Sequence, residues 1–299
     1  MRTDLCAPSR SGNFSKTQSC LTIYEMRSVA ALYNQDNASD PIPKSDFTNV
    51  DLLRDALDKR FTSCKGKELC WLEQPAIKQS RDLYMRLQRN FKPKKPESWK
   101  RNKRQWLNTY DILDVMKQYS EAHTEFEFMG VFPVDFQAKV GQSQCVVQSM
   151  CNFSVEQLID NGKSSFGIVF NLDKHNQPGS HWVACFCSLD PKDSKFGICY
   201  FDSVGKKPPR EIFDFMKSVK EQCKLIFKQH MSKFVAKFNC TQKQFKNTEC
   251  GIFSMVFIKF CLENKQKSYR QVRKMIGKDD DIFQFRETLY ASLDHELTK

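Results

Sequence analysis

Cys250 is the residue whose surroundings best suit nucleophilic chemistry. It comes directly before residues 251–262, whose apolar side chains predict a buried helix that starts at the cysteine itself. Unpaired backbone N–H groups and the macrodipole at a helix N-terminus favour negative charge, and the thiolate is the attacking form of cysteine. Gly251 is expected to leave space for a substrate backbone. Cys250 is therefore a candidate nucleophile, although a cysteine before a glycine can equally be a buried core residue.

A histidine and an aspartate stand at the ends of two predicted strands. His181 precedes residues 182–189 and Asp202 follows residues 196–201, and both segments are rich in apolar and aromatic residues bounded by Gly, Asp, Pro or Ser. If these strands are neighbours, Asp202 can bind the outer imidazole nitrogen of His181, select its tautomer and stabilise the imidazolium. The imidazolium in turn would stabilise the thiolate. His175 is an alternative base, but its surroundings predict a turn away from the strand end.

Gln244 lies six residues before Cys250 and could donate its amide N–H to a developing oxyanion, together with the backbone N–H of Cys250. Taken singly, Gln244 reads as a solvated polar side chain and Asp202 as an ordinary turn residue. The order His181, Asp202, Gln244, Cys250 and its placement at element ends favour a catalytic set for acyl transfer.

The pattern of apolar residues places these side chains in an α+β fold. The segments 166–170, 182–189 and 196–201 predict adjacent strands of one sheet, with a further strand at 234–238. Apolar residues at helical spacing predict helices at 23–33, 46–61, 75–90, 106–119, from Pro208 and Pro209 to about 226, and 282–293. We expect a helical N-terminal domain over residues 1–105 and a catalytic domain over residues 106–299.

Composition limits the class of protein. Hydrophobic residues make up 40% and charged residues 27% of the 299 residues, with 25 phenylalanines, which is typical of a globular chain with an aromatic core. No apolar run has the length of a signal peptide core or of a membrane-spanning helix, so we expect a soluble intracellular protein with no membrane contact. The thirteen cysteines are odd in number and form no CxxC pair, so we predict reduced thiols, no metal site and no cofactor.

The net charge of +12 indicates an acidic partner. Nine basic residues against one acidic residue are concentrated in residues 86–104, where two prolines interrupt any helix: Arg86, Arg89, Lys92, Lys94, Lys95, Lys100, Arg101, Lys103 and Arg104. This segment is predicted to be a linker between the two domains, either simply solvated or in contact with nucleic acid.

Three short motifs resemble the adenain and SUMO-protease group of cysteine proteases. They are Ser180-His181-Trp182, Tyr200-Phe201-Asp202-Ser203, and Gln244 with Glu249-Cys250-Gly251. Within that group they are most similar to the polyprotein-processing protease type of African swine fever virus, over residues 166–258, with a weaker likeness at 70–78. The resemblance implies a papain-like core with a central mixed β-sheet flanked by helices, preceded by a helical arm domain. It also implies cleavage after Gly-Gly sequences in a narrow cleft, where Trp182 covers the glycine backbone.

The chain departs from the African swine fever type at the orienting residue. That type carries Asn where this chain has Asp202, whereas SUMO proteases carry Asp, so a tighter ion pair with His181 is expected here. Gln244 has the spacing of the SUMO-protease group, and Asn247 is the alternative for the oxyanion hole.

Three functions remain open from the sequence. The first is an endopeptidase that matures viral structural polyproteins at assembly sites in the host cytoplasm and in the virion, which the arm-like region and the basic linker favour. The second is an isopeptidase that removes SUMO or other ubiquitin-like modifiers. The third is a basic nucleic-acid-binding scaffold with a vestigial protease fold, against which the intact set of four residues argues.

Overall fold

The computed structural model describes residues 5–10, 19–141 and 144–291 and divides into two compact units. The first unit is Met1–Lys95 with Glu287–Lys299, and the second is Pro96–Arg286. The division falls inside the basic segment at Lys95, ten residues before the predicted boundary at residue 105. The reason is that residues 99–105 pack onto the second unit, where Trp99 is buried beneath the guanidinium of Arg286.

The first unit is helical. Its elements are η2 (Pro8–Arg10), α1 (Ile23–Asp36), η4 (Lys44–Thr48), α2 (Val50–Arg60), η5 (Thr62–Cys64), α3 (Glu68–Trp71), α4 (Pro75–Gln79) and α5 (Arg81–Gln88). The predicted helix over 46–61 is present as α2, capped by the Asn49 side chain, which accepts hydrogen bonds from the backbone N–H groups of Asp51 and Leu52. The predicted helix over 75–90 is instead two helices separated at Ser80.

The second unit contains a five-stranded mixed sheet. Its elements are η6 (Glu97–Lys100), α6 (Thr109–Ala122), β1 (Phe126–Pro133), β2 (Lys139–Val140), β3 (Gln144–Cys145), α7 (Gln148–Cys151), α8 (Val155–Asp160), β4 (Ser165–Asn171), β5 (Trp182–Ser188), β6 (Gly197–Phe201), α9 (Arg210–Ile226), η7 (Lys228–Lys233), β7 (Val235–Phe238), α10 (Cys250–Glu263), α11 (Tyr269–Met275) and α12 (Asp279–Phe283). Helix α13 (Phe285–Leu289) spans the boundary between the units.

The strand order is β1-β4-β5-β6-β7. The three central strands are antiparallel, and the two outer strands pair in parallel with their neighbours. The predicted neighbours β4, β5 and β6 are confirmed, and the fold class is α+β as predicted. Strand β1 was not predicted, because Gly130 and Pro133 interrupt its apolar run and its register shifts between Phe128 and Gly130.

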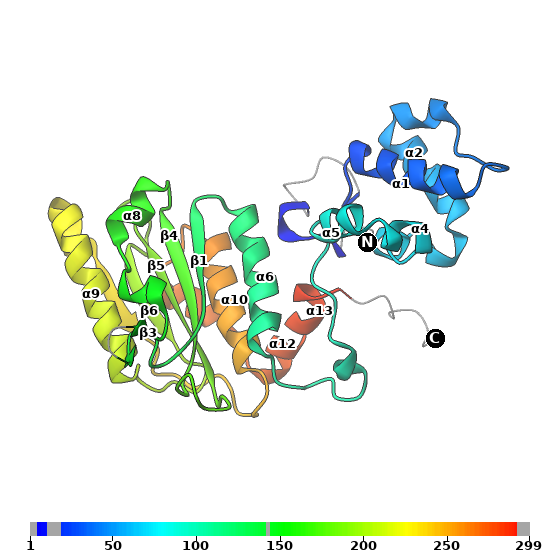
Figure 1. The fold of residues 1–299 in the computed structure, drawn as a ribbon. Helices are drawn as coiled ribbons and strands as arrows, with labels where there is room; N and C mark the ends of the chain where they lie inside the picture. Colours follow the sequence, from blue (N-terminus) through cyan, green and yellow to red (C-terminus); the bar gives the residue numbers. More distant parts are fainter. Residues whose placement is uncertain (1–4, 11–18, 142–143, 292–299) are drawn as a thin grey trace. The chain divides into compact units, whose positions relative to one another are not determined.

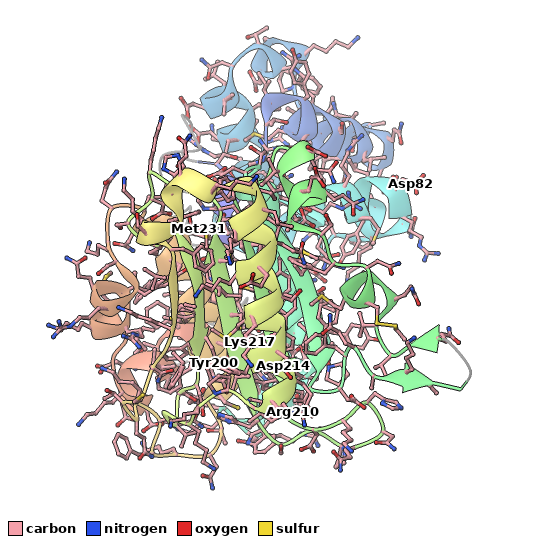
Figure 2. All side chains as sticks on the ribbon, turned by 90° about the vertical axis from the view of Figure 1, so that its left-hand side faces the viewer. Asp82, Tyr200, Arg210, Asp214, Lys217 and Met231 are labelled. Atoms are coloured by element: carbon pink, nitrogen blue, oxygen red, sulfur yellow. A yellow bond between two sulfur atoms is a disulfide. The ribbon has the colours of Figure 1, made fainter. Side chains whose placement is uncertain are left out.

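Helices cover both faces of this sheet. Helix α9 lies on one face, and α6 and α10 lie on the other (Figure 1). Figure 2 looks onto α9 from outside, with Tyr200 of β6 on the sheet beneath it and Arg210, Asp214 and Lys217 on the helix. These three charged residues form exposed ion pairs, which contribute little to stability. The apolar side of α9, from Ile212 to Cys223, is buried against the sheet.

The cysteine prediction is wrong in part. Three disulfides join Cys6 to Cys20, Cys64 to Cys70 and Cys145 to Cys151, and the other seven cysteines are free. Each pair is close enough in sequence for local folding to bring the two thiols together, which the odd total count concealed. The free pair Cys185 and Cys187 is buried in β5, as the strand spacing indicated.

The basic segment is not a freely solvated linker. Lys94 pairs with Glu73, Lys95 with Glu287, and Lys100 with Glu97. Arg86 lies in α5 and Arg89 is its C-cap residue, and both are exposed.

Within the described part of the chain, no helix combines the length and the apolar character needed to cross a membrane.

Candidate active site

Helix α10 begins at Cys250, as the apolar pattern predicted. Glu249 is its N-cap residue, but the Glu249 side chain makes no capping hydrogen bond to the helix. The first-turn N–H groups are therefore not occupied by this carboxylate and can stabilise negative charge on the sulfur or on a bound oxyanion. Cys250 itself is only 1% exposed.

The carboxylate of Glu249 is instead bound by two arginines. The Nε of Arg286 donates to Glu249 Oε2 at 2.8 Å, and Nη1 of Arg104 donates to Oε1 at 3.3 Å. Glu249 and Arg286 are almost completely buried. Arg286 also donates to the backbone carbonyl of Gln105 and stacks on the Trp99 ring at 4.5 Å. This cluster ties the residue before Cys250 to two segments that are distant in sequence.

His181 lies between Asp202 and Cys250. Its Nε2 is 2.6 Å from Asp202 Oδ1, and the ring also makes a side-chain hydrogen bond with Cys250. Since Nε2 faces the carboxylate, Nδ1 is the nitrogen available to the thiol. Burial alone lowers the pKa of the imidazole, but the hydrogen bonds and charges of Asp202 and Cys250 outweigh burial and raise the pKa of His181 to about 9.

Asp202 is fully buried directly after β6 and is held from several sides. Its Oδ1 accepts from the backbone N–H of Val204 at 2.9 Å, and its Oδ2 accepts from that of Lys206 at 3.0 Å. The Asn239 side chain binds both the N–H and the carbonyl of Asp202, at 2.8 and 2.6 Å. These bonds leave the carboxylate little freedom to turn away from His181.

Gln244 is buried, whereas its alternative Asn247 is exposed. The Gln244 Oε1 atom accepts a hydrogen bond from Ser203 Oγ at 2.6 Å, and its Nε2 donates to the carbonyl of Lys246 at 2.6 Å. One N–H of the amide is used in this way and one remains for another acceptor. This ordered amide favours Gln244 over Asn247 as the oxyanion donor.

Trp182 follows His181 and is 7% exposed. Its indole Nε1 donates to the backbone carbonyl of Leu107 at 3.0 Å. The Leu107 side chain in turn fills the space beside Gly251, where an added Cβ would lie 2.9 Å from Leu107 Cδ1. The space beside this glycine is thus filled by Leu107. The prediction that Gly251 leaves space for a substrate backbone is therefore wrong.

A cavity of about 550 Å³ opens beside His181 and Trp182. Trp106, Val131, Phe132, Val147 and Pro178 are among its other lining residues. His175 also lines this cavity, but its Nδ1 lies 2.7 Å from Asp135 Oδ2 and its backbone N–H donates to Asp135 Oδ1. His175 is therefore paired with a different carboxylate, and His181 is the histidine that contacts Cys250.

The structure thus brings together His181, Asp202 and Cys250, and orders Gln244 near the start of the same helix. It adds three groups that the sequence reasoning missed: the Leu107 carbonyl, the Ser203 hydroxyl and Arg286. Ser203 lies inside a motif that had been singled out, so its position was a usable signal, whereas Leu107 and Arg286 come from segments far from Cys250 in sequence. Among residues 5–10, 19–141 and 144–291, no group of three or more His, Cys, Asp or Glu side chains is placed to hold a metal ion.

Comparisons with known proteins find similar sequences among proteases. Residues 168–299 match the family model described as the Ulp1 protease family, C-terminal catalytic domain. A protein of Acanthamoeba polyphaga mimivirus, named as a candidate thiol protease, is 26% identical over 273 residues, which are 85% of this chain and 83% of that protein. A cysteine protease of African swine fever virus is 27% identical over 249 residues, covering 80% of this chain and 87% of the relative. In another isolate of that virus, the relative with the same identity is named a SUMO-1 cysteine protease.

A solved structure shares the fold. The crystal structure of the African swine fever virus protease superposes with a TM-score of 0.63 at 22% identity, over 97% of this chain and 98% of that one. At this identity the likeness establishes the fold, including the helical N-terminal region. The family match over residues 168–299, the homologues and the fold show that this chain is similar to cysteine proteases of the Ulp1 type.

Proposed function

We propose that Cys250, His181 and Asp202 form the catalytic triad of an endopeptidase. The observation that carries this proposal is the position of the His181 imidazole, which is hydrogen-bonded on one side to buried Asp202 and on the other to Cys250 at the start of α10. A raised histidine pKa favours the imidazolium, which is the partner that a cysteine thiolate requires.

The reaction then follows from these positions. The Cys250 sulfur attacks the scissile carbonyl carbon, and the carbonyl oxygen becomes an oxyanion. This oxyanion accepts hydrogen bonds from the Gln244 side-chain N–H and from the backbone N–H of Cys250. The His181 imidazolium gives its proton to the leaving amine as the C–N bond breaks, which leaves a thioester on Cys250. Water, deprotonated by His181, then attacks the thioester, and the acid product leaves as the thiol re-forms.

Cleavage after Gly-Gly sequences is the proposed specificity. Cys250 is 1% exposed, and Trp182, which follows His181, is held by its hydrogen bond to the Leu107 carbonyl. A sulfur this enclosed is best reached by a substrate with no side chains next to the scissile bond, because any larger residue would overlap the walls. Trp106 is 43% exposed and lines the cavity beside Trp182, so it supplies a second aromatic surface for the glycine backbone.

We propose viral structural polyproteins as the substrates, processed at assembly sites in the host cytoplasm and in the virion. The relatives are proteins of two viruses, and the one from African swine fever virus aligns across most of this chain. The helical first unit favours this reading over a free-standing isopeptidase domain, because the fold likeness to the African swine fever virus protease covers it.

The test is cleavage of a Gly-Gly-Xaa reporter peptide by the full chain. Cys250→Ala is expected to abolish cleavage and His181→Ala to lower kcat/KM by about a thousandfold or more. Cys240→Ala is the matched control, since Cys240 is an exposed free cysteine and its loss should leave kcat/KM unchanged. Full activity of Cys250→Ala, or no cleavage by the wild type, would exclude the proposed function.

Ubiquitin-like conjugates are the second candidate substrates, because one relative is named a SUMO-1 cysteine protease. Parallel incubation with SUMO conjugates and with polyprotein junctions separates the two uses. Cleavage of conjugates without cleavage of junctions would assign the isopeptidase function instead.

Nucleic-acid contact is a further proposal for the exposed part of the basic segment. Arg86 and Arg89 in the first unit and Arg101 and Lys103 in the second are exposed. If they bind phosphates, the affinity for DNA falls steeply with salt and falls further in variants with these residues replaced by Gln. Salt-independent or absent binding would leave the segment with a structural role only.

A further inference from the structure

The amide of Gln244 can serve an oxyanion only if its N–H side faces the reacting carbonyl. An amide can turn over and present its oxygen instead, which would repel the oxyanion rather than stabilise it. Something in the structure must therefore decide which way this side chain is turned.

The backbone carbonyl of Lys246 excludes one of the two orientations. It lies 2.6 Å from Gln244 Nε2, and a carbonyl can only accept a hydrogen bond, so the NH₂ group must be on this side. The Oε1 atom is then turned to Ser203 Oγ at 2.6 Å. Because Oε1 can only accept, the Ser203 hydroxyl must be the donor in this bond.

We propose that Ser203 is a positioning residue for the oxyanion hole, and this inference rests on the proposed protease function of Gln244. Its hydroxyl locks the Gln244 amide with one N–H bound to Lys246 and the other free for the oxyanion. Ser203 is 1% exposed and Gln244 is 5% exposed, so water is not at hand to replace the hydroxyl. Without it, the buried Oε1 lacks a donor, and only the bond to the Lys246 carbonyl still holds the amide.

The backbone around Ser203 fits the same role. The Ser203 carbonyl accepts from the backbone N–H groups of Lys243 and Gln244, at 2.7 and 2.9 Å. Gly205 has a positive φ of 79°, and a Cβ there would lie 2.9 Å from the backbone of the 241–242 segment. Hydrogen bonds thus connect the end of β6 to the loop that carries Gln244. In this proposal Asp202 orients the base His181, and the adjacent Ser203 orients the oxyanion donor Gln244.

The test is a double-mutant cycle on the full chain with the Gly-Gly-Xaa reporter. Ser203→Ala is expected to lower kcat about tenfold and to leave KM within about twofold, because the lost interaction acts in the transition state. Gln244→Ala lowers kcat more. In the Gln244→Ala background, Ser203→Ala has no further effect, since the amide it orients is gone.

Control variants separate positioning from general stability. Ser188→Ala removes another buried serine hydroxyl, which donates a 3.0 Å hydrogen bond to Asp193. This bond lies away from the site, so the variant should leave kcat unchanged. Ser203→Ala reducing kcat by the same factor with and without Gln244 would overturn the proposal, as would an unchanged kcat. Absence of cleavage by the wild type, or full activity of Cys250→Ala, would instead sink the proposed function.

A readout that does not need activity tests the orientation itself. The side-chain NH₂ resonances of Gln244, assigned by their loss in Gln244→Ala, should shift or broaden in Ser203→Ala and stay in place in Ser188→Ala. Unchanged Gln244 amide resonances in Ser203→Ala would overturn the positioning role even if the protein proved to have another activity.

Discussion

His181 is the residue on whose protonation the proposed mechanism depends. Burial of its ring would disfavour the charge, but Asp202 and Cys250 raise its pKa to about 9, compared with 6.5 for an exposed imidazole. In the proposed mechanism, the charged ring pairs with the thiolate and later protonates the leaving amine.

We expect kcat/KM to hold up to alkaline pH and then fall as pH rises through about 9, because the imidazolium is lost there. The same sign holds for stability. The folded-state pKa is the higher one, so the charged ring stabilises the fold fully below about pH 6.5, and this contribution disappears as pH rises through about 9. Measuring kcat/KM and the unfolding midpoint between pH 5.5 and 10 tests the predicted fall in activity and the predicted loss of stability.

Asp202→Asn is the matched variant for this profile. It removes the negative charge beside Nε2, so the alkaline fall in kcat/KM should move to lower pH and kcat should decrease. A fall at the same pH in wild type and variant would mean that Asp202 does not control the imidazole.

At the scale of elements, the start of α10 is packed by the segment before α6. Gly251→Ala places a methyl group 2.9 Å from Leu107 Cδ1, so the Leu107 side chain must move. Overpacking of this kind costs about 1–2 kcal/mol of the free energy of unfolding. Because the Leu107 carbonyl holds Trp182, kcat/KM for the Gly-Gly reporter should fall as well.

Urea denaturation and reporter kinetics measure these two effects. Gly251→Ala combined with Leu107→Ala should recover part of the lost kcat/KM relative to Gly251→Ala alone, since the clash is relieved. If Gly251→Ala is as stable and as active as the wild type, the contact with Leu107 does not constrain the helix start.

The Glu249–Arg286 pair joins the N-cap of α10 to the end of the second unit. Arg286→Met leaves the buried Glu249 carboxylate with Arg104 and the Thr248 hydroxyl, and breaking a buried ion pair in this way should cost about 3 kcal/mol of the free energy of unfolding. Glu249→Gln combined with Arg286→Met removes both charges, so it should be more stable than Arg286→Met alone. Chemical denaturation of the wild type and these two variants gives the comparison, and equal stability of the single and double variants would show that the Glu249 charge carries no penalty.

At the scale of the whole molecule, the cysteines divide into two classes that thiol counting distinguishes. All thirteen are in the described residues, six in disulfides and seven free. Protein purified without reductant and then unfolded should show seven reactive thiols, and thirteen after reduction. Thirteen before reduction would show that the three disulfides do not form.

Native protein offers a second count. Among the free cysteines Cys240 is exposed, whereas Cys250 and the five others are buried. Burial raises the pKa of Cys185, Cys187, Cys199, Cys223 and Cys261, which makes these thiols unreactive. We therefore expect alkylation of the native protein at Cys240, and at Cys250 where the site activates it, and peptide mapping identifies the labelled positions.

The sequence by itself was sufficient for the parts that depend on local patterns. The helix at Cys250 follows from twelve mostly apolar positions, and strands β4, β5 and β6 follow from short apolar runs between turn residues, so His181 and Asp202 could be placed at strand ends. The three motifs were specific enough to indicate the Ulp1-type protease group, which the family match confirms. Local propensity and spacing carry this information because each element spans only a few neighbouring residues.

Only the tertiary structure decided which distant groups meet at the site. Three of these contacts join residues that are far apart in sequence. The Leu107 carbonyl binds Trp182 across 75 positions, Arg286 binds Glu249 across 37, and His175 pairs with Asp135 across 40. Disulfide pairing and the filled space beside Gly251 likewise depend on how elements pack. Sequence spacing does not encode such contacts, because the folded chain sets them through the buried volume and hydrogen-bond partners that remain once the sheet and helices have assembled.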